Sequence, residues 1–111
     1  MTSSEHPNLE PFVLTKATQP SLLLSRGMAP KVPIFEARGW LGGGHDWASV
    51  ARVILFERLP DLVDVVKFDP EASMFAAHGP PEAMLRLGAE MLRAYNDDDV
   101  LRDFLSRAEI D

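Results

Sequence analysis

The sequence contains no cysteine. This absence excludes disulfides, thiolate nucleophiles and cysteine-based zinc sites, and it agrees with a reducing compartment. The chain also lacks a run of about 18 apolar residues, the length that a membrane-spanning helix needs. The first residues show neither a basic stretch nor a following apolar run, the two marks of a secretion signal. We therefore expect a soluble protein of the cytoplasm that contacts no membrane.

Basic residues are in the minority, since 11 Lys and Arg stand against 17 Asp and Glu, a formal net charge of −6. Negative charge disfavours binding to phosphate backbones and anionic lipid, so nucleic acid is not an expected ligand. The negative charge can raise the association rate with a basic partner, and an equally good explanation is that it keeps the protein soluble. A chain of 111 residues is long enough for one core. We expect a partly ordered segment over 1–11 and a single domain over 12–111.

Short apolar runs bounded by turn residues predict two β-hairpins. The runs 12–16 and 21–25 form the first hairpin, and the runs 65–68 and 73–77 form the second. The second hairpin is expected to turn at 69–72, because a proline presets the backbone there and an aspartate can bond to it.

Apolar residues at helical spacing predict four helices, over 32–38, 47–59, 82–95 and about 100–108. The third and fourth are separated by an aspartate-rich stop that can also cap the fourth. The expected fold is α+β, with helices on one face of a small, mostly antiparallel four-stranded sheet, in the order ββααββαα.

The most distinctive stretch, 38–51, holds four of the seven glycines and both tryptophans. Gly39 is expected to end one helix, and the Asp46 carboxylate to cap the next one by accepting amides such as that of Ser49. Trp47 begins the apolar stripe of that second helix and is expected in the core. The stretch therefore predicts a rigid bend between two helices.

Trp40 and Leu41 lie inside this bend, where no helical face can hide them. We expect the bend to expose an indole, which suits recognition better than chemistry. A different interpretation treats the glycine-rich corner 39–47 as a pocket of a small ligand-binding domain or enzyme. A third is a homo-oligomeric scaffold.

Candidate catalytic and metal-binding groups are few. The three histidines all fall in predicted loops, outside any nucleophile signature: His6, His45 and His78. His45 and Asp46 supply at most two metal ligands, whereas a site needs three or four. The glycines at 42–44 resemble a phosphate loop, but no Gly-Lys-Ser/Thr follows them and Asp46 would repel an anion. We expect no catalytic residue, no cofactor and no metal.

Two motifs and the C-terminal end resemble a known family. The first motif joins Glu36-Ala37-Arg38-Gly39 to His45-Asp46-Trp47 through the glycine run, and the second is Phe68-Asp69-Pro70-Glu71-Ala72-Ser73-Met74-Phe75. With the ending 104–111, they resemble the immunity protein 51 family of bacterial polymorphic toxin systems. Gly43 and His45 stand where the family motif Gly-x-x-Gly-Asn-Gly-Tyr-Asp-Trp has Asn and Tyr.

The resemblance implies a cytoplasmic α+β protein that neutralises a cognate toxin by binding it, without catalysis. The acidic charge favours a basic toxin such as a nuclease. The candidate contacts are two hydrophobic anchors, two residues beside them and two acidic residues of the second motif: Trp40, Leu41, His45, Asp46, Asp69 and Glu71. If the two motifs lie far apart, only one of them can form the patch.

Overall fold

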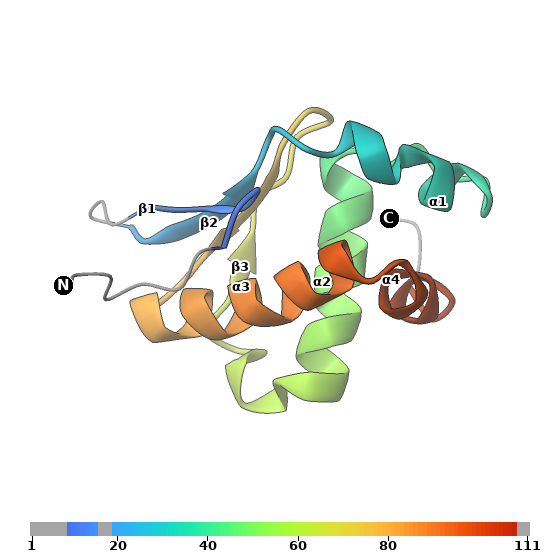
Figure 1. Cartoon of the computed structure of the whole chain (residues 1–111). Helices are drawn as coiled ribbons and strands as arrows, with labels where there is room; N and C mark the ends of the chain where they lie inside the picture. The colour runs from blue at the N-terminus through green and yellow to red at the C-terminus, as the bar shows by residue number, and fades with distance from the viewer. Residues whose placement is uncertain (1–8, 16–18, 109–111) are drawn as a thin grey trace, which may run out of the picture.

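A four-stranded antiparallel sheet lies at one side of the molecule (Figure 1). The computed structural model describes residues 9–15 and 19–108. Its strands are β1 (Val13–Thr15), β2 (Ser21–Leu24), β3 (Lys67–Phe68) and β4 (Phe75–His78), in the spatial order β1-β2-β4-β3. Both predicted hairpins are confirmed, and β2 pairs with β4 to join them. Residues 1–8 of the predicted N-terminal segment lie outside the described residues.

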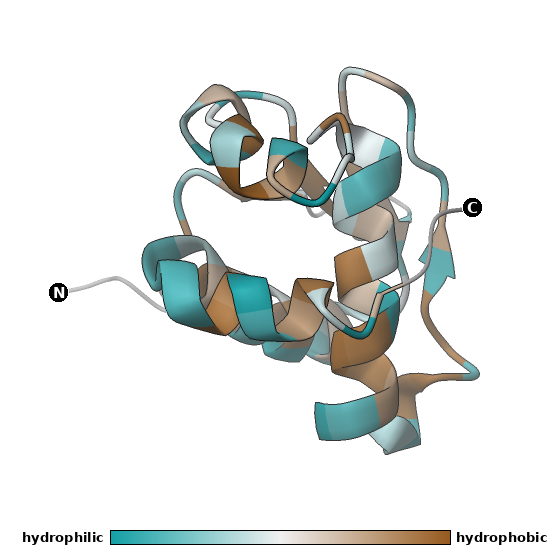
Figure 2. Cartoon of the chain, turned by 90° about the vertical axis from the view of Figure 1, so that its right-hand side faces the viewer, coloured by the Kyte–Doolittle hydropathy of each residue, from teal (hydrophilic) through white to brown (hydrophobic). Residues whose placement is uncertain are grey.

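Two α-helices follow each hairpin, which gives the predicted order ββααββαα and confirms the expected fold class. They are α1 (Val32–Glu36), α2 (Gly44–Arg58), α3 (Pro81–Asn96) and α4 (Asp98–Leu105), with short 3-10 turns at Ala29–Lys31 and Pro60–Leu62. Helix α2 contacts β4, α3 contacts β1 and β2, and α4 packs on α2 and α3. Figure 2 shows apolar and polar residues mixed along the helices. In α3 and α4 the buried residues share one face, whereas α2 is buried throughout 47–51.

Asp97 separates the last two helices, as the aspartate-rich stop predicts. Its carboxylate accepts the amides of Asp99 and Val100, at 3.0 and 3.4 Å, and so caps α4. The chain can therefore reverse between α3 and α4 without leaving the first amides of α4 unpaired.

The strand register gives the sheet an inner and an outer face. The inner face carries fully buried residues of the core: Leu22, Leu24, Phe75 and Ala77. Leu23 and Ala76, which pair with each other, alternate with these residues and lie on the outer face. All four helices lie on the inner side of the sheet (Figure 1).

Trp47 is the centre of the core, as predicted, and is fully buried. Its ring packs against the rings of Phe12, Phe35 and Tyr95, with centroids 6.2, 5.2 and 6.0 Å away. These rings come from the start of the chain, from α1 and from α3, so one side chain of α2 holds distant segments together.

Trp40 is buried as well, at 9% exposure, and belongs to the same core cluster. The expectation of an exposed indole is therefore wrong. The reason is local: Gly39 reverses the chain, and the Trp40 amide then donates to the carbonyl of Phe35 at 3.0 Å, which brings the indole back to the core.

Two further details differ from the sequence prediction. Val65 and Val66 are not part of a strand, because the amides of both donate to the Leu62 carbonyl in a turn and only 67–68 pair with β4. Phe56 has the helical spacing of the apolar stripe of α2, yet it is 70% exposed, because it lies beyond the edge of the core cluster.

Arg107 ties the end of the chain to α2. Its guanidinium donates to both carboxylate oxygens of Glu57, at 2.5 and 2.8 Å, and to Asp103 at 3.0 Å. These hydrogen bonds hold the pKa values of the Glu57 and Asp103 carboxyls below their ordinary values of 4.5 and 3.8. The contacts are exposed, so their contribution to stability is small at neutral pH.

We expect Trp47→Ala to lower the free energy of unfolding by about 3–5 kcal/mol, because it empties the centre of the aromatic cluster. Phe56→Ala is the matched control on the same helix and should change it by less than about 0.5 kcal/mol. Urea denaturation followed by circular dichroism measures both, and equal losses would contradict this description of the core.

The Arg107 contacts predict a small dependence of stability on pH. Lowered pKa values mean that the folded protein binds protons more weakly at Glu57 and Asp103, so their contribution is complete above the ordinary values and is lost on acidification. Arg107→Gln should therefore lower stability slightly at pH 7 and reduce the loss between neutral pH and about pH 3. Urea midpoints at both pH values check this, and an unchanged acid loss would refute it.

Candidate functional site

The glycine-rich segment between α1 and α2 forms the predicted bend. Helix α1 ends at Glu36, two residues before the predicted end, and a turn follows in which the Gly39 amide donates to the carbonyl of Glu36 at 2.9 Å. Gly39, at a φ of +81°, reverses the chain after this turn. Gly42, at a φ of +85°, makes the second reversal. Both positions use a backbone region that favours glycine.

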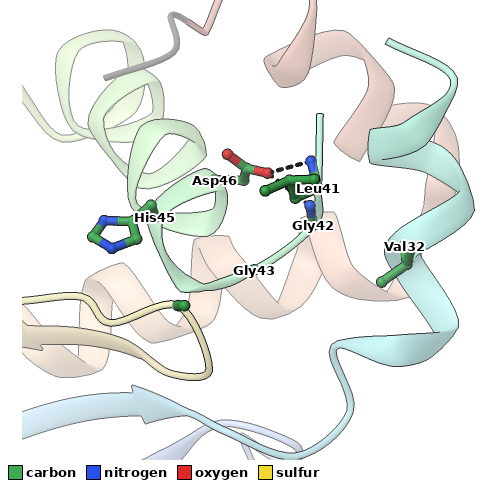
Figure 3. A pocket seen from close by; sticks show the side chains of 7 residues that line it. Val32, Leu41, Gly42, Gly43, His45 and Asp46 are labelled. Carbon is green, nitrogen blue, oxygen red and sulfur yellow. Dashed lines mark hydrogen bonds between the residues drawn. The ribbon is translucent and has the colours of Figure 1, made fainter. Parts of the chain in front are cut away.

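Asp46 fixes this bend in a way the sequence did not predict. Helix α2 begins at Gly44, three residues before the predicted start, so Asp46 lies inside the first turn rather than before it. Its carboxylate reaches back and accepts the amides of Leu41 and Gly42, at 2.8 and 2.6 Å (Figure 3). The prediction that Asp46 caps α2 by accepting the Ser49 amide is wrong, because the extended Gly43 takes the capping position.

The start of α2 is pressed against the second motif. The Gly44 amide donates to the Ala72 carbonyl at 3.1 Å. A Cβ on Gly44 would stand 2.1 Å from the Glu71 carbonyl oxygen and 2.2 Å from that of Met74, so no other residue fits without movement of the backbone. The two motifs are therefore in direct contact, and both can contribute to one surface.

The second motif forms the tip of the β3–β4 hairpin. Glu71 and Met74 exchange backbone hydrogen bonds of 2.8 and 3.1 Å, and Asp69 donates to Ala76 at 3.0 Å. The turn is thus 71–74, and the predicted turn at 69–72 is wrong. Pro70 continues the line of β3 instead, at a position whose amide would face away from β4.

The candidate residues differ sharply in exposure. Leu41 is 85% exposed, His45, Asp69 and Glu71 are also exposed, and neither of these two acidic residues has an ion pair within the described part of the chain. Asp46 is half-buried and engaged with the loop amides. The exposed part of the bend is therefore Leu41 with His45.

A shallow hollow of about 300 Å³ lies beside the glycine loop, lined by Val32 and Ala72 as well as by the loop itself. Figure 3 shows the His45 ring directed away from both Asp46 and Val32. The two side chains with acid–base chemistry thus do not converge in this hollow. This arrangement gives little support to the interpretation of the corner as a catalytic pocket.

Two histidines lie in regular structure, which corrects the prediction that they are in loops. His45 is in the first turn of α2, and His78 is the last residue of β4. The Nδ1 atom of His78 lies 2.6 Å from the Ser21 hydroxyl, which donates to the Gln19 carbonyl at 3.1 Å. The hydrogen bond between the two side chains joins the first residue of β2 to the last residue of β4. His6 lies outside the described residues.

Over residues 9–15 and 19–108, no group of three or more His, Asp or Glu side chains is placed to hold a metal ion. None of the helices described there is long and apolar enough to cross a membrane.

The contact that matters most here could not be read from side-chain types. Ala72 offers its backbone carbonyl to Gly44, and an alanine in a turn gives no signal of such a role. Three successive glycines, 42–44, indicate that another backbone segment can approach closely, but they do not indicate which segment it is.

The fold and this corner define a small α+β domain that presents a rigid, exposed surface. The family model described as immunity protein 51 matches residues 16–110. The chain therefore belongs to the immunity protein 51 family, as the two motifs suggest. No curated protein and no solved structure matches the chain. Family membership points to toxin neutralisation as the role of the protein.

Replacing Gly44 tests the contact between the motifs. Gly44→Ala should cost about 1–3 kcal/mol, because the new methyl group collides with two carbonyls, and it should speed hydrogen exchange at the Met74 amide. Gly39→Ala is the control: it has open space but a positive φ, so it should cost about 1–2 kcal/mol without changing exchange in the hairpin. Equal exchange in both variants would refute the close contact.

Proposed function

We propose that this protein protects its producer in the cytoplasm by binding and neutralising a cognate toxin, without catalysis. The proposed contact surface consists of Leu41 and His45 from the glycine-rich segment together with the hairpin tip at 71–74. From here on, the name corner refers to this surface. The observation that carries the proposal is the junction of Gly44 with Ala72, which joins both family motifs beside a leucine that is 85% exposed.

Leu41 is suited to be the hydrophobic anchor of the corner. Burial of a fully exposed leucine contributes about 1.5–3 kcal/mol. Its backbone is already held by the Asp46 carboxylate, so little conformational entropy remains to be lost on binding. Asp46 and the buried Trp40 then act as positioning residues that hold Leu41, rather than as contacts.

Asp69 and Glu71 give the hairpin its charge. Both are exposed, and no Lys or Arg of the described chain pairs with them. Together with the net charge of −6, they favour a toxin whose matching surface is basic, as in a nuclease. These charges are expected to raise the association rate more than the final affinity.

The direct test is coexpression with the C-terminal domain of the toxin encoded beside this gene, scoring survival and copurification. We expect the cells to survive and the two chains to copurify. Failure of both, with a toxin shown to be active, would remove the proposal. Survival without copurification would contradict the binding mechanism while leaving protection in place.

Leu41→Lys should weaken toxin binding at least about tenfold, since it removes an anchor and adds a charge of the wrong sign, with little change in melting temperature. Phe56→Lys, at an apolar position of α2 that is 70% exposed, is the matched control and should bind normally. Trp40→Ala should lose stability as well as binding, because Trp40 is in the core. Calorimetric titration with inactivated toxin measures these affinities, and normal binding by Leu41→Lys would exclude the corner.

A further inference from the structure

The outer face of the sheet is a second surface that the core does not use. Pairing of the strands aligns one row across all four of them: Val13 lies opposite Leu23, Leu23 opposite Ala76, and Ala76 opposite Asp69. Residues that oppose one another across a sheet point to the same face. Ala76 is buried, at 2% exposure, whereas Val13, Leu23 and Asp69 are neither buried nor part of the core cluster.

This row is apolar for three of its four positions. Val13 is 53% exposed, Leu23 is partly exposed and Ala76 is buried, so the open apolar surface consists of Val13 and Leu23 at the β1 side. The next row is polar throughout, with Thr15, Ser21, His78 and Lys67. An open sheet face normally reads as polar, so an apolar row on it indicates a surface that another molecule covers.

The acidic residues of the second motif share this face. Asp69 ends the apolar row, and Glu71 follows it on the same side because side chains alternate along an extended chain. The Glu71 carbonyl also stands against Gly44 at the start of α2. The hairpin tip therefore borders the corner on one side and the outer face on the other.

We propose that the outer face forms part of the toxin-binding surface, with Val13 and Leu23 as its apolar centre and Asp69 and Glu71 as its acidic margin. The inference rests on the proposed function and extends it. The matching surface of the toxin is an apolar patch with Lys or Arg on the side that meets the hairpin. Charge selects this occupant, because two copies of a chain carrying −6 repel each other and a basic partner is attracted.

The partner is expected to lie on the face rather than to extend the sheet. Asp69 directs its amide to β4, so the amides of the neighbouring positions face the free edge of the sheet. At one of these positions stands Pro70, which has no amide to donate.

The experiment measures binding of purified variants to the inactivated C-terminal domain of the toxin encoded beside this gene, by calorimetric titration. Val13→Lys should raise the Kd at least about tenfold, because it places a positive charge against a basic partner and removes apolar contact. Val13→Thr keeps the shape and strand preference of the side chain and should change the Kd less than about threefold.

Asp69→Lys should weaken binding and reduce the dependence of the Kd on salt concentration. Phe56→Lys, on α2, carries the same charge as Val13→Lys and should bind normally.

Each alternative result has a separate meaning. Normal binding by folded Val13→Lys, while Leu41→Lys fails to bind, would confine the toxin to the corner and overturn this inference alone. Absence of binding by the unchanged protein would remove the proposed function together with it. Sedimentation that finds a dimer, lost in Val13→Lys, would assign the face to a second copy and overturn the toxin as its occupant. If Val13→Lys fails to fold, Val13→Gln, which removes the apolar contact without adding a charge, decides the question, because Asp69 also belongs to the hairpin of the proposed function.

Discussion

The close approach of Gly44 to the β3–β4 hairpin is the constraint on which the rest of the structure depends. Its amide bonds to the Ala72 carbonyl, and two further carbonyls lie so near that a Cβ has no room. This contact holds the start of α2 and the hairpin tip in a fixed position relative to each other. Three residues later, Trp47 enters the core, and its ring packs against Phe12, which precedes β1, and against Tyr95 of α3. A displaced helix start would therefore disturb the exposed corner and the core together.

The first turn of α2 divides its tasks among neighbouring residues. Gly44 contacts the hairpin, Asp46 holds the preceding loop through two amides, and Trp47 packs into the core. His45, the one remaining residue of that turn, is exposed. Because each neighbour is held by backbone contact or burial, the exposed residues Leu41 and His45 are each presented in a defined position. Such preorganisation lowers the entropy lost on binding and suits a protein that acts by contact.

Much of the fold followed from sequence patterns, and the errors share one cause. The spacing of apolar residues and the positions of turn residues predicted the order of elements, the pairing of both hairpins and the burial of Trp47. Each of these features depends on local backbone preference or on a strong apolar pattern. Trp40 was expected outside because it lacks a helical face, yet Gly39 folds it back onto the carbonyl of Phe35. The cap at Asp46 and the turn at 69–72 failed similarly, since backbone contacts between distant segments decided both. The nearness of the two motifs could not be derived, because an Ala72 carbonyl carries no sequence signal.

The described chain carries both engaged and unengaged carboxylates. Many are engaged within the molecule: Glu57 and Asp103 with Arg107, Asp61 with Arg86, Asp98 with Lys31, and Asp46 and Asp97 with backbone amides. Engaged carboxylates are partly neutralised by their partners and contribute less to the field outside. Asp69 and Glu71, like Glu36, Asp64 and Glu82, have no ion pair in the described part of the chain, and the strand register places Asp69 and Glu71 at the hairpin between the corner and the outer face. A basic partner drawn to this hairpin meets Leu41 on one side and the Val13–Leu23 row on the other. Two apolar surfaces that look unrelated in the sequence thus lie on either side of the same pair of charges.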